Sequence, residues 1–333
     1  MSPELTAPLE LPARPAAVAV AVEVPTLLVI GFTFAGWLAT THLYGRWPLW
    51  LVAPLAAVLV TLHSSLQHEI IHGHPTRWRG VNRLFGMLSL SLWLPYECYR
   101  REHLAHHINE RLTDPHDDPE SNYWTAADWA RMNPVSRTVW RMQRTLAGRV
   151  AIGSFWRIGR FLAAQTCAVV KNESRLRAVW FEHLVWCAPV IFWLKFACAM
   201  PVWIYIVAVV IPANGILLIR SFAEHRAREA VPERTAIVEG ARILGPLFLY
   251  NNLHALHHRE PLIPWYDYNR RYGELREELI AANGGLVYAG YFDVARRYLF
   301  RPQDSLLHPM GGIPLLRPKP RTVLPDPLSR LHV

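Results

Sequence analysis

Four apolar runs in this chain are each long enough to cross a lipid bilayer, and they restrict the fold to a bundle of helices. They form two hairpins, residues 24–43 with 48–67 and residues 180–199 with 201–219. About 20 helical residues span a hydrocarbon core of about 30 Å, where every backbone polar group needs an internal partner. The third run contains Glu182 and Lys195 near its ends, and Met200-Pro201 marks the second turn. We expect an all-α polytopic membrane protein with about four transmembrane helices.

Basic residues indicate how these helices are oriented. Of the 35 Lys and Arg residues, 16 lie in residues 68–178 and 16 in residues 220–333, the two long polar stretches. Basic loops stay on the cytoplasmic side, so both stretches and both termini are expected there. The net charge of +9 is explained by this orientation and by attraction to anionic headgroups, and no nucleic-acid partner is expected.

Half of the 16 histidines lie in three short clusters within the polar stretches. These are His68-x-x-x-His72, His103-x-x-His106-His107 and His254-x-x-His257-His258. Spacings of three and four residues place imidazoles on one face of a helix, where their nitrogens can converge. Topology brings all three clusters to the same side of the membrane. A metal site on a helical cytosolic cap is therefore predicted.

The number of imidazoles indicates two metal ions. A zinc site is complete with three or four ligands, which is fewer than the clusters supply. Thiolate ligation is not expected because the cysteines form no Cys-x-x-Cys pair; they are Cys98, Cys167, Cys187 and Cys198. Neutral nitrogen ligands suit iron, zinc, copper or nickel, so ligand type alone leaves the metal open.

The clusters, HEIIH at 68–72, HLAHH at 103–107 and HALHH at 254–258, resemble the three histidine boxes of the integral-membrane fatty acid desaturase and hydroxylase superfamily. The flanking segments TDPHDDPES (113–121) and PWY (264–266) add to the likeness. The resemblance implies two non-haem irons that use O2 as co-substrate to attack a C–H bond of a lipid. It also implies a ninth ligand, which falls on His225 in RSFAEHR. The implied ligand set is His68, His72, His103, His106, His107, His225, His254, His257 and His258.

The resemblance divides the chain into three parts and implies two partners. Residues 1–23 are expected to be a flexible tail, residues 24–270 the membrane di-iron oxidoreductase domain, and residues 271–333 a cytosolic extension. The partners would be a lipid from the membrane and an external electron donor of the ferredoxin, rubredoxin or cytochrome b5 type.

The reaction remains open between desaturation and oxygen insertion. The first box of acyl desaturases usually reads His-Asp. In this chain it reads His68-Glu69, which is similar to the first box of the membrane alkane hydroxylases. The third box, NNLHALHH followed by PLIPWY, resembles both desaturases and carotenoid ketolases. An acyl-chain desaturase is the first choice, and the alternative is a hydroxylase or ketolase acting on an alkane, sterol, sphingoid base or carotenoid. A membrane metal transporter or sensor is the remote alternative, because it would place its ligands within the spans.

Several polar side chains near the boxes are candidates to support the ligands. A carboxylate that accepts the second ring N–H of a ligating imidazole fixes its tautomer. Candidates for this role or for contact with metal-bound water are Glu69, Asp114, Asp117, Asp118, Glu120, Glu224, Asn251 and Asn252. The competing interpretation for residues 114–120 is an acidic loop of Asx and Pro turns. His74 is expected beside the site or at the surface, and His308 is expected not to be a ligand.

Two shorter apolar segments have interpretations of their own. Residues 84–96 are too short to span a bilayer and are expected to lie at its interface or to re-enter it. Residues 150–170 suit either an amphipathic helix at the interface or a helix packed on the cytosolic domain.

Overall fold

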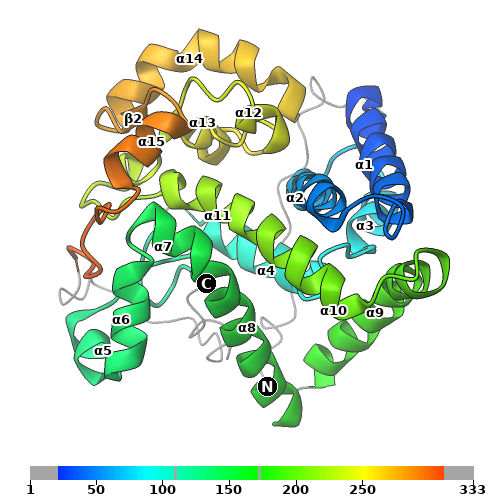
Figure 1. The fold of residues 1–333 in the computed structure, drawn as a ribbon. Helices are drawn as coiled ribbons and strands as arrows, with labels where there is room; N and C mark the ends of the chain where they lie inside the picture. The colour runs from blue at the N-terminus through cyan, green and yellow to red at the C-terminus, as the bar shows by residue number, and fades with distance from the viewer. Residues whose placement is uncertain (1–21, 109–110, 172–173, 311–333) are drawn as a thin grey trace.

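Helices make up almost all of the regular structure in a computed structural model that describes residues 22–108, 111–171 and 174–310 (Figure 1). Within these ranges the strands are β1 (Ile237–Val238) and β2 (Val287–Tyr288), which pair in parallel. The predicted all-α class is confirmed.

Four helices are long and apolar enough to cross a membrane, and they form the two predicted hairpins. The first hairpin is α1 (Val24–His42) and α2 (Leu49–Ile71). The third span is α9 (Ser174–Phe192) with its π-helical continuation η4 (Trp193–Ala197). The fourth combines α10 (Val202–Tyr205), η5 (Ile206–Val210) and α11 (Ile211–Glu224). The second turn falls at Met200-Pro201, as expected.

Helix α2 lies at the centre of the bundle, against α1, α11 and η5. Its buried face includes Val52, Ala56, Ala57 and Val60, each at most 1% exposed. Small side chains let helix backbones approach closely, which is how helices associate in lipid. Helix α2 is also longer than the predicted span, because it continues without a break through the first histidine cluster.

The apolar segment 84–96 belongs partly to this bundle. It covers the end of α3 (Arg79–Met87) and a loop that leads into α4 (Tyr96–His106). Leu90 in the loop is fully buried, and its carbonyl accepts a hydrogen bond from the Tyr205 hydroxyl at 2.8 Å. That hydroxyl in turn accepts from Trp37 Nε1 at 2.9 Å. The loop therefore packs against the membrane-spanning helices, and the Tyr205 hydroxyl satisfies one of its buried carbonyls, the kind of pairing that a re-entrant segment requires.

The remaining helices form a cap around the ends of α2 and α11. Between the hairpins these are α5 (Ala126–Arg131), α6 (Pro134–Met142), α7 (Leu146–Ala151) and α8 (Gly153–Val170). After α11 come η6 (Val231–Arg234), α12 (Leu244–Leu247), α13 (His254–Arg259), η7 (Trp265–Asp267), α14 (Tyr268–Ala282) and α15 (Tyr291–Tyr298). Helix α8 covers most of the segment 150–170, for which an amphipathic or packed helix was predicted, and it packs on α9 and α11.

The boundary expected at residue 23 falls where α1 begins, whereas the one expected at residue 270 falls inside a helix. Helix α14 runs through residue 270, and its Leu279 packs in one apolar cluster with Leu256 of α13. The part of the predicted extension up to residue 310 thus shares a core with the third histidine cluster. The predicted tail lies outside the described residues except for Val22 and Glu23. Glu23 is buried, and its backbone N–H donates to the Pro75 carbonyl.

Candidate metal centre

Four helix ends carry the nine predicted histidines into one buried region of the cap. His68 lies in the last turn of α2, and His72 is its C-cap. The second cluster occupies the end of α4, with His107 as C-cap. The third cluster makes up most of α13, and His225 is the residue that ends α11. Because α2 and α11 are membrane-spanning helices, the imidazoles gather directly at the ends of two spans.

The nine imidazoles separate into two sets. In the first, His68, His72, His103 and His257 each bring a ligand atom within 4.8 Å of the others; in the second, His106, His225, His254 and His258 do the same. His107 adjoins the first set, with its Nε2 3.0 Å from His103 Nε2 and 2.9 Å from His257 Nε2. Its ring also stacks on His258 at 4.5 Å between centroids, so it lies where the two sets meet.

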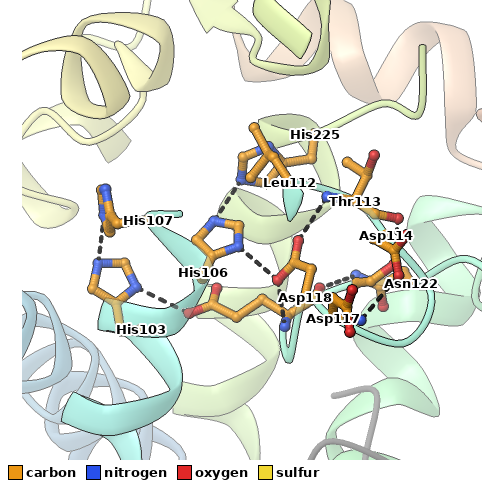
Figure 2. Close-up of polar contacts among 12 residues, drawn as sticks. His103, His106, His107, Leu112, Thr113, Asp114, Asp117, Asp118, Asn122 and His225 are labelled. Atoms are coloured by element: carbon orange, nitrogen blue, oxygen red, sulfur yellow. Dashed lines mark hydrogen bonds and ion pairs between the residues drawn. The ribbon is translucent and has the colours of Figure 1, made fainter. Parts of the chain in front are cut away.

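Hydrogen-bond acceptors outside the sets determine which ring nitrogen faces inward. Glu120 Oε1 lies 2.9 Å from His103 Nδ1, and Asp118 Oδ1 lies 2.8 Å from His106 Nδ1 (Figure 2). The Arg234 carbonyl lies 3.2 Å from the Nδ1 of His225. Because a carboxylate or carbonyl oxygen only accepts, each of these imidazoles carries its proton on Nδ1. Its Nε2 lone pair then points toward the neighbouring imidazoles.

The inward nitrogens lie close enough together to share an ion. Nε2···Nε2 separations are 2.9 Å for His72 and His103, 3.0 Å for His106 and His225, and 2.8 Å for His225 and His254. For His225 and His254, whose Nδ1 atoms both face acceptors, the two Nε2 atoms carry lone pairs that repel at this distance, and a positive ion between them converts repulsion into ligation. Ligands about 2.1 Å from an ion lie about 3.0 Å apart at right angles and about 3.4 Å apart in a tetrahedron. Separations of this size fit two nitrogens that bind one ion at neighbouring positions, and within each set of four all ligand atoms lie within 4.8 Å of one another.

Electrostatics keep most of these imidazoles in the ligating, neutral form. Burial lowers the pKa of seven of them: His72, His103, His107, His225, His254, His257 and His258. For His225 the pKa falls to about 3. His106 is the exception, since burial would lower its pKa but the carboxylates of Asp118 and Glu120 raise it to about 9. Binding of a metal ion at its Nε2 therefore displaces a proton.

Comparison with known proteins agrees with this geometry. The sequence profile described as fatty acid desaturase matches residues 45–291, which is well over half of the chain. The chain belongs to the fatty acid desaturase family. A search among curated proteins finds none that matches. The match runs from the turn of the first hairpin to the start of α15, so it includes all three histidine boxes, His225 and both histidine sets.

In this desaturase-family protein the fold of loop 113–121 decides which acidic side chains reach the histidines. Asp118 faces the centre, and its two oxygens also accept the backbone N–H groups of Thr113 and Glu120 at 2.7 and 2.8 Å. Asp114 instead accepts the N–H groups of residues 116 and 117, which closes an Asx turn on the outside of the loop (Figure 2). The Asp117 side chain is exposed. Only part of the acidic segment thus supports ligands, and the rest forms the turns of the competing interpretation.

Of the other candidate supporting residues, some contact a histidine ring and others contact the backbone of neighbouring segments. Asn251 Oδ1 lies 3.0 Å from His254 Nδ1, and Glu224 Oε1 lies 3.4 Å from the same nitrogen. Asn252 faces away and donates to the Val238 carbonyl at 2.7 Å, so it connects the third box to β1. Glu69 accepts a hydrogen bond from the backbone N–H of Trp265 at 3.3 Å, which links the first box to the PWY segment.

Sequence reasoning missed the partner of His257. The Tyr268 hydroxyl lies 2.8 Å from His257 Nδ1 and is fully buried at the start of α14. The spacing of eleven residues gives no helical-face signal because Pro261 and Pro264 interrupt the helix between His257 and Tyr268, and only the proximity of PWY to the third box pointed to this segment.

Two of the buried histidines outside the sets, His74 and His308, contact segments next to the site. His74 is fully buried rather than at the surface, with Nδ1 2.6 Å from Glu23 Oε1. His308 Nε2 lies 3.2 Å from the Thr113 hydroxyl. His308 therefore braces the loop that carries Asp118, and His74 anchors the residue that precedes α1.

Proposed function

We propose that this protein is an O2-dependent di-iron lipid oxidoreductase, and that it acts as an acyl-chain desaturase. The observation that carries the proposal is the pair of imidazole sets at the ends of two membrane-spanning helices. Two sets of four or five nitrogen ligands suit two irons better than one structural zinc, which is complete with four ligands. Family membership supports a desaturase-like oxidoreductase in general.

The ligand sets assign each histidine to one ion. His68, His72, His103, His107 and His257 would hold the first, and His106, His225, His254 and His258 the second. When bound, the irons supply the reduction of O2 and the oxidising power that removes hydrogen from an unactivated C–H bond. Asp118 and Glu120 hold the Nδ1 protons of His106 and His103, which keeps both imidazoles oriented for ligation. The electrons would come from an external redox protein.

The location of the centre favours a lipid substrate. His68 lies in the last turn of α2 and His225 caps α11, so the ligands lie at the membrane end of the cap, where a lipid chain in the bilayer is nearer than a soluble metabolite. The same location weighs against a metal transporter, whose ligands would lie within the spans. The distribution of Lys and Arg supports a cytoplasmic position for the cap and for both termini.

Oxygen insertion is the rival outcome because of the first box. Glu69 replaces the aspartate usual in acyl desaturases, and it is buried where the first box meets the PWY segment. Hydroxylation or ketolation would use the same two ions and the same ligands. Desaturation and oxygen insertion are therefore distinguished by their products and not by their metal centres.

Lipid analysis of a host that lacks the activity tests the proposal. With O2 and a co-expressed reductant, we expect a lipid that is two mass units lighter than its precursor. A product only sixteen or fourteen units heavier would replace desaturation by hydroxylation or ketolation. The matched variants are His254→Ala, which removes a ligand and should abolish the product, and His116→Ala, which removes an exposed histidine paired with Asp128 and should retain it. No change in any lipid by protein that holds its irons would refute the assignment.

A further inference from the structure

A polar cavity lies in the cap, outside the histidine sets. It has a volume of about 260 Å³ and lies where the chain leaving α11, the turn before β2 and helix α15 meet. Its charged and aromatic lining consists of Arg226, Arg228, Glu233, Tyr288, Arg297 and Tyr298. Ligand pockets for small molecules begin at about 300 Å³, so the cavity suits a compact group.

Three guanidinium groups and one carboxylate line the cavity. Arg226 is the guanidinium among them whose charge no ion pair offsets in the described part of the chain. Arg228 and Arg297 have acidic partners behind them, Asp304 at 3.3 Å and Asp293 at 2.7 Å. These contacts hold the two side chains in place, and both remain partly exposed, at 39% and 44%.

Arg226 is the least satisfied of the three. It donates to the Tyr298 hydroxyl, and its guanidinium lies 5.8 Å from the Tyr288 ring and 5.2 Å from the Tyr298 ring. No ion pair within 4.0 Å joins it to a carboxylate in the described part of the chain, and its buried Nε has no hydrogen-bond partner there. The terminal guanidinium nitrogens of Arg226, whose one printed acceptor is the Tyr298 hydroxyl, keep N–H groups that an acceptor in the cavity would satisfy.

The two tyrosines add neutral donors. The Tyr298 hydroxyl accepts from Arg226, and the Tyr288 hydroxyl accepts from Gln303 Nε2 at 3.4 Å. Each hydroxyl keeps its own hydrogen for donation. The cavity therefore offers guanidinium and hydroxyl donors together, which is the donor set that recognises a phosphate through several short, charge-assisted bonds.

We propose that this cavity is a binding site for a phosphate group, separate from the metal centre and on the same side of the membrane. The proposal does not depend on the lipid reaction, since it rests on Arg226, Arg228, Arg297 and the tyrosine pair. A phosphate reaches it either as a lipid headgroup or as a soluble phosphate compound, and both present the same oxygens.

Binding measurements on the purified full-length protein in detergent test the site. Inorganic phosphate is titrated calorimetrically in a chloride buffer, and phosphatidic acid against phosphatidylcholine is scored by native mass spectrometry. Arg228→Gln and Arg297→Gln should each weaken binding about tenfold or more, the usual effect of losing one hydrogen bond to a charged group. Binding of free phosphate identifies a soluble ligand, and binding of phosphatidic acid alone identifies a headgroup site.

The control is Arg296→Gln. Arg296 pairs with Asp293 just as Arg297 does, at 3.2 Å, but it does not line the cavity. Its loss removes the same charge from the same helix and should leave binding unchanged. Failure of both probes to bind, or equal weakening by Arg296→Gln and Arg297→Gln, would overturn the proposal, and circular dichroism of each variant verifies that the helical fold persists.

Discussion

Replacing Asp118 by asparagine should loosen one metal ion and spare the other. The Asp118 carboxylate is 1% exposed and accepts three N–H groups, those of His106, Thr113 and Glu120. An asparagine side chain has the same shape but only one accepting oxygen. If that oxygen stays on His106, the amide NH2 group meets the Thr113 N–H, donor against donor. If the amide turns round, His106 Nδ1 loses its acceptor instead.

The size of the effect follows from these two arrangements. Leaving a buried N–H without an acceptor costs roughly 1–3 kcal/mol. Loss of the acceptor behind a ligating histidine lowers metal affinity about 10- to 100-fold, or about 1.4–2.7 kcal/mol. His106 belongs to the second set, so the penalty falls on the second ion. The first ion depends on Glu120 behind His103, and that contact is unchanged.

Iron retention against a graded series of a ferrous chelator measures the difference. At a chelator concentration where the unchanged protein keeps two irons per chain, Asp118→Asn should keep about one. Asp117→Asn is the matched control, because it removes the adjacent, exposed carboxylate with no contact to a histidine ring in the described chain. If Asp118→Asn held both irons as tightly as the unchanged protein, or if Asp117→Asn lost as much, the reasoning about the Nδ1 acceptor would be refuted.

Three further outcomes are expected. Protein purified in detergent should contain about two irons per chain by elemental analysis; one stoichiometric zinc with full activity would contradict the two-set assignment. Tyr268→Phe removes the hydroxyl behind His257 and should lower the affinity of the first ion about tenfold in the same chelator series, whereas unchanged affinity would show that packing alone orients this imidazole. Reporters fused near residue 130 and at the C-terminus should read as cytoplasmic and one at residues 45–46 as external; opposite locations for the first two would disprove the orientation.

Spacing and hydropathy predicted the membrane helices and the grouping of the histidines, because both depend on local periodicity. Hydropathy alone did not locate the end of α2, although the His68-x-x-x-His72 spacing indicated a helix there. Its apolar run ends near residue 67, but the helix continues to Ile71 because His68 and His72 turn inward on the same face. His225 has no neighbouring histidine, and only the resemblance to a family pointed to it.

The supporting residues were harder to predict because loop geometry decides them. Asp114, Asp117 and Asp118 are chemically alike and almost adjacent, and the Asx turn at Asp114 determines that Asp118 alone of the three faces inward. Asn251 and Asn252 point to opposite sides of the chain for the same reason. Such choices depend on backbone direction within a loop, which composition and spacing do not encode.

The metal centre also acts on the chain as a cross-link. His107 and His257 are in contact across 150 residues of sequence, and the stretch between them contains the whole second hairpin. A bound ion would therefore close a very long loop, and closure of long loops removes the most freedom from an unfolded chain. Iron supply would then determine the lifetime of the folded protein in the cell as well as its catalytic rate. A chain that never acquires the ions has a cap that opens more readily, and proteases can cleave it there.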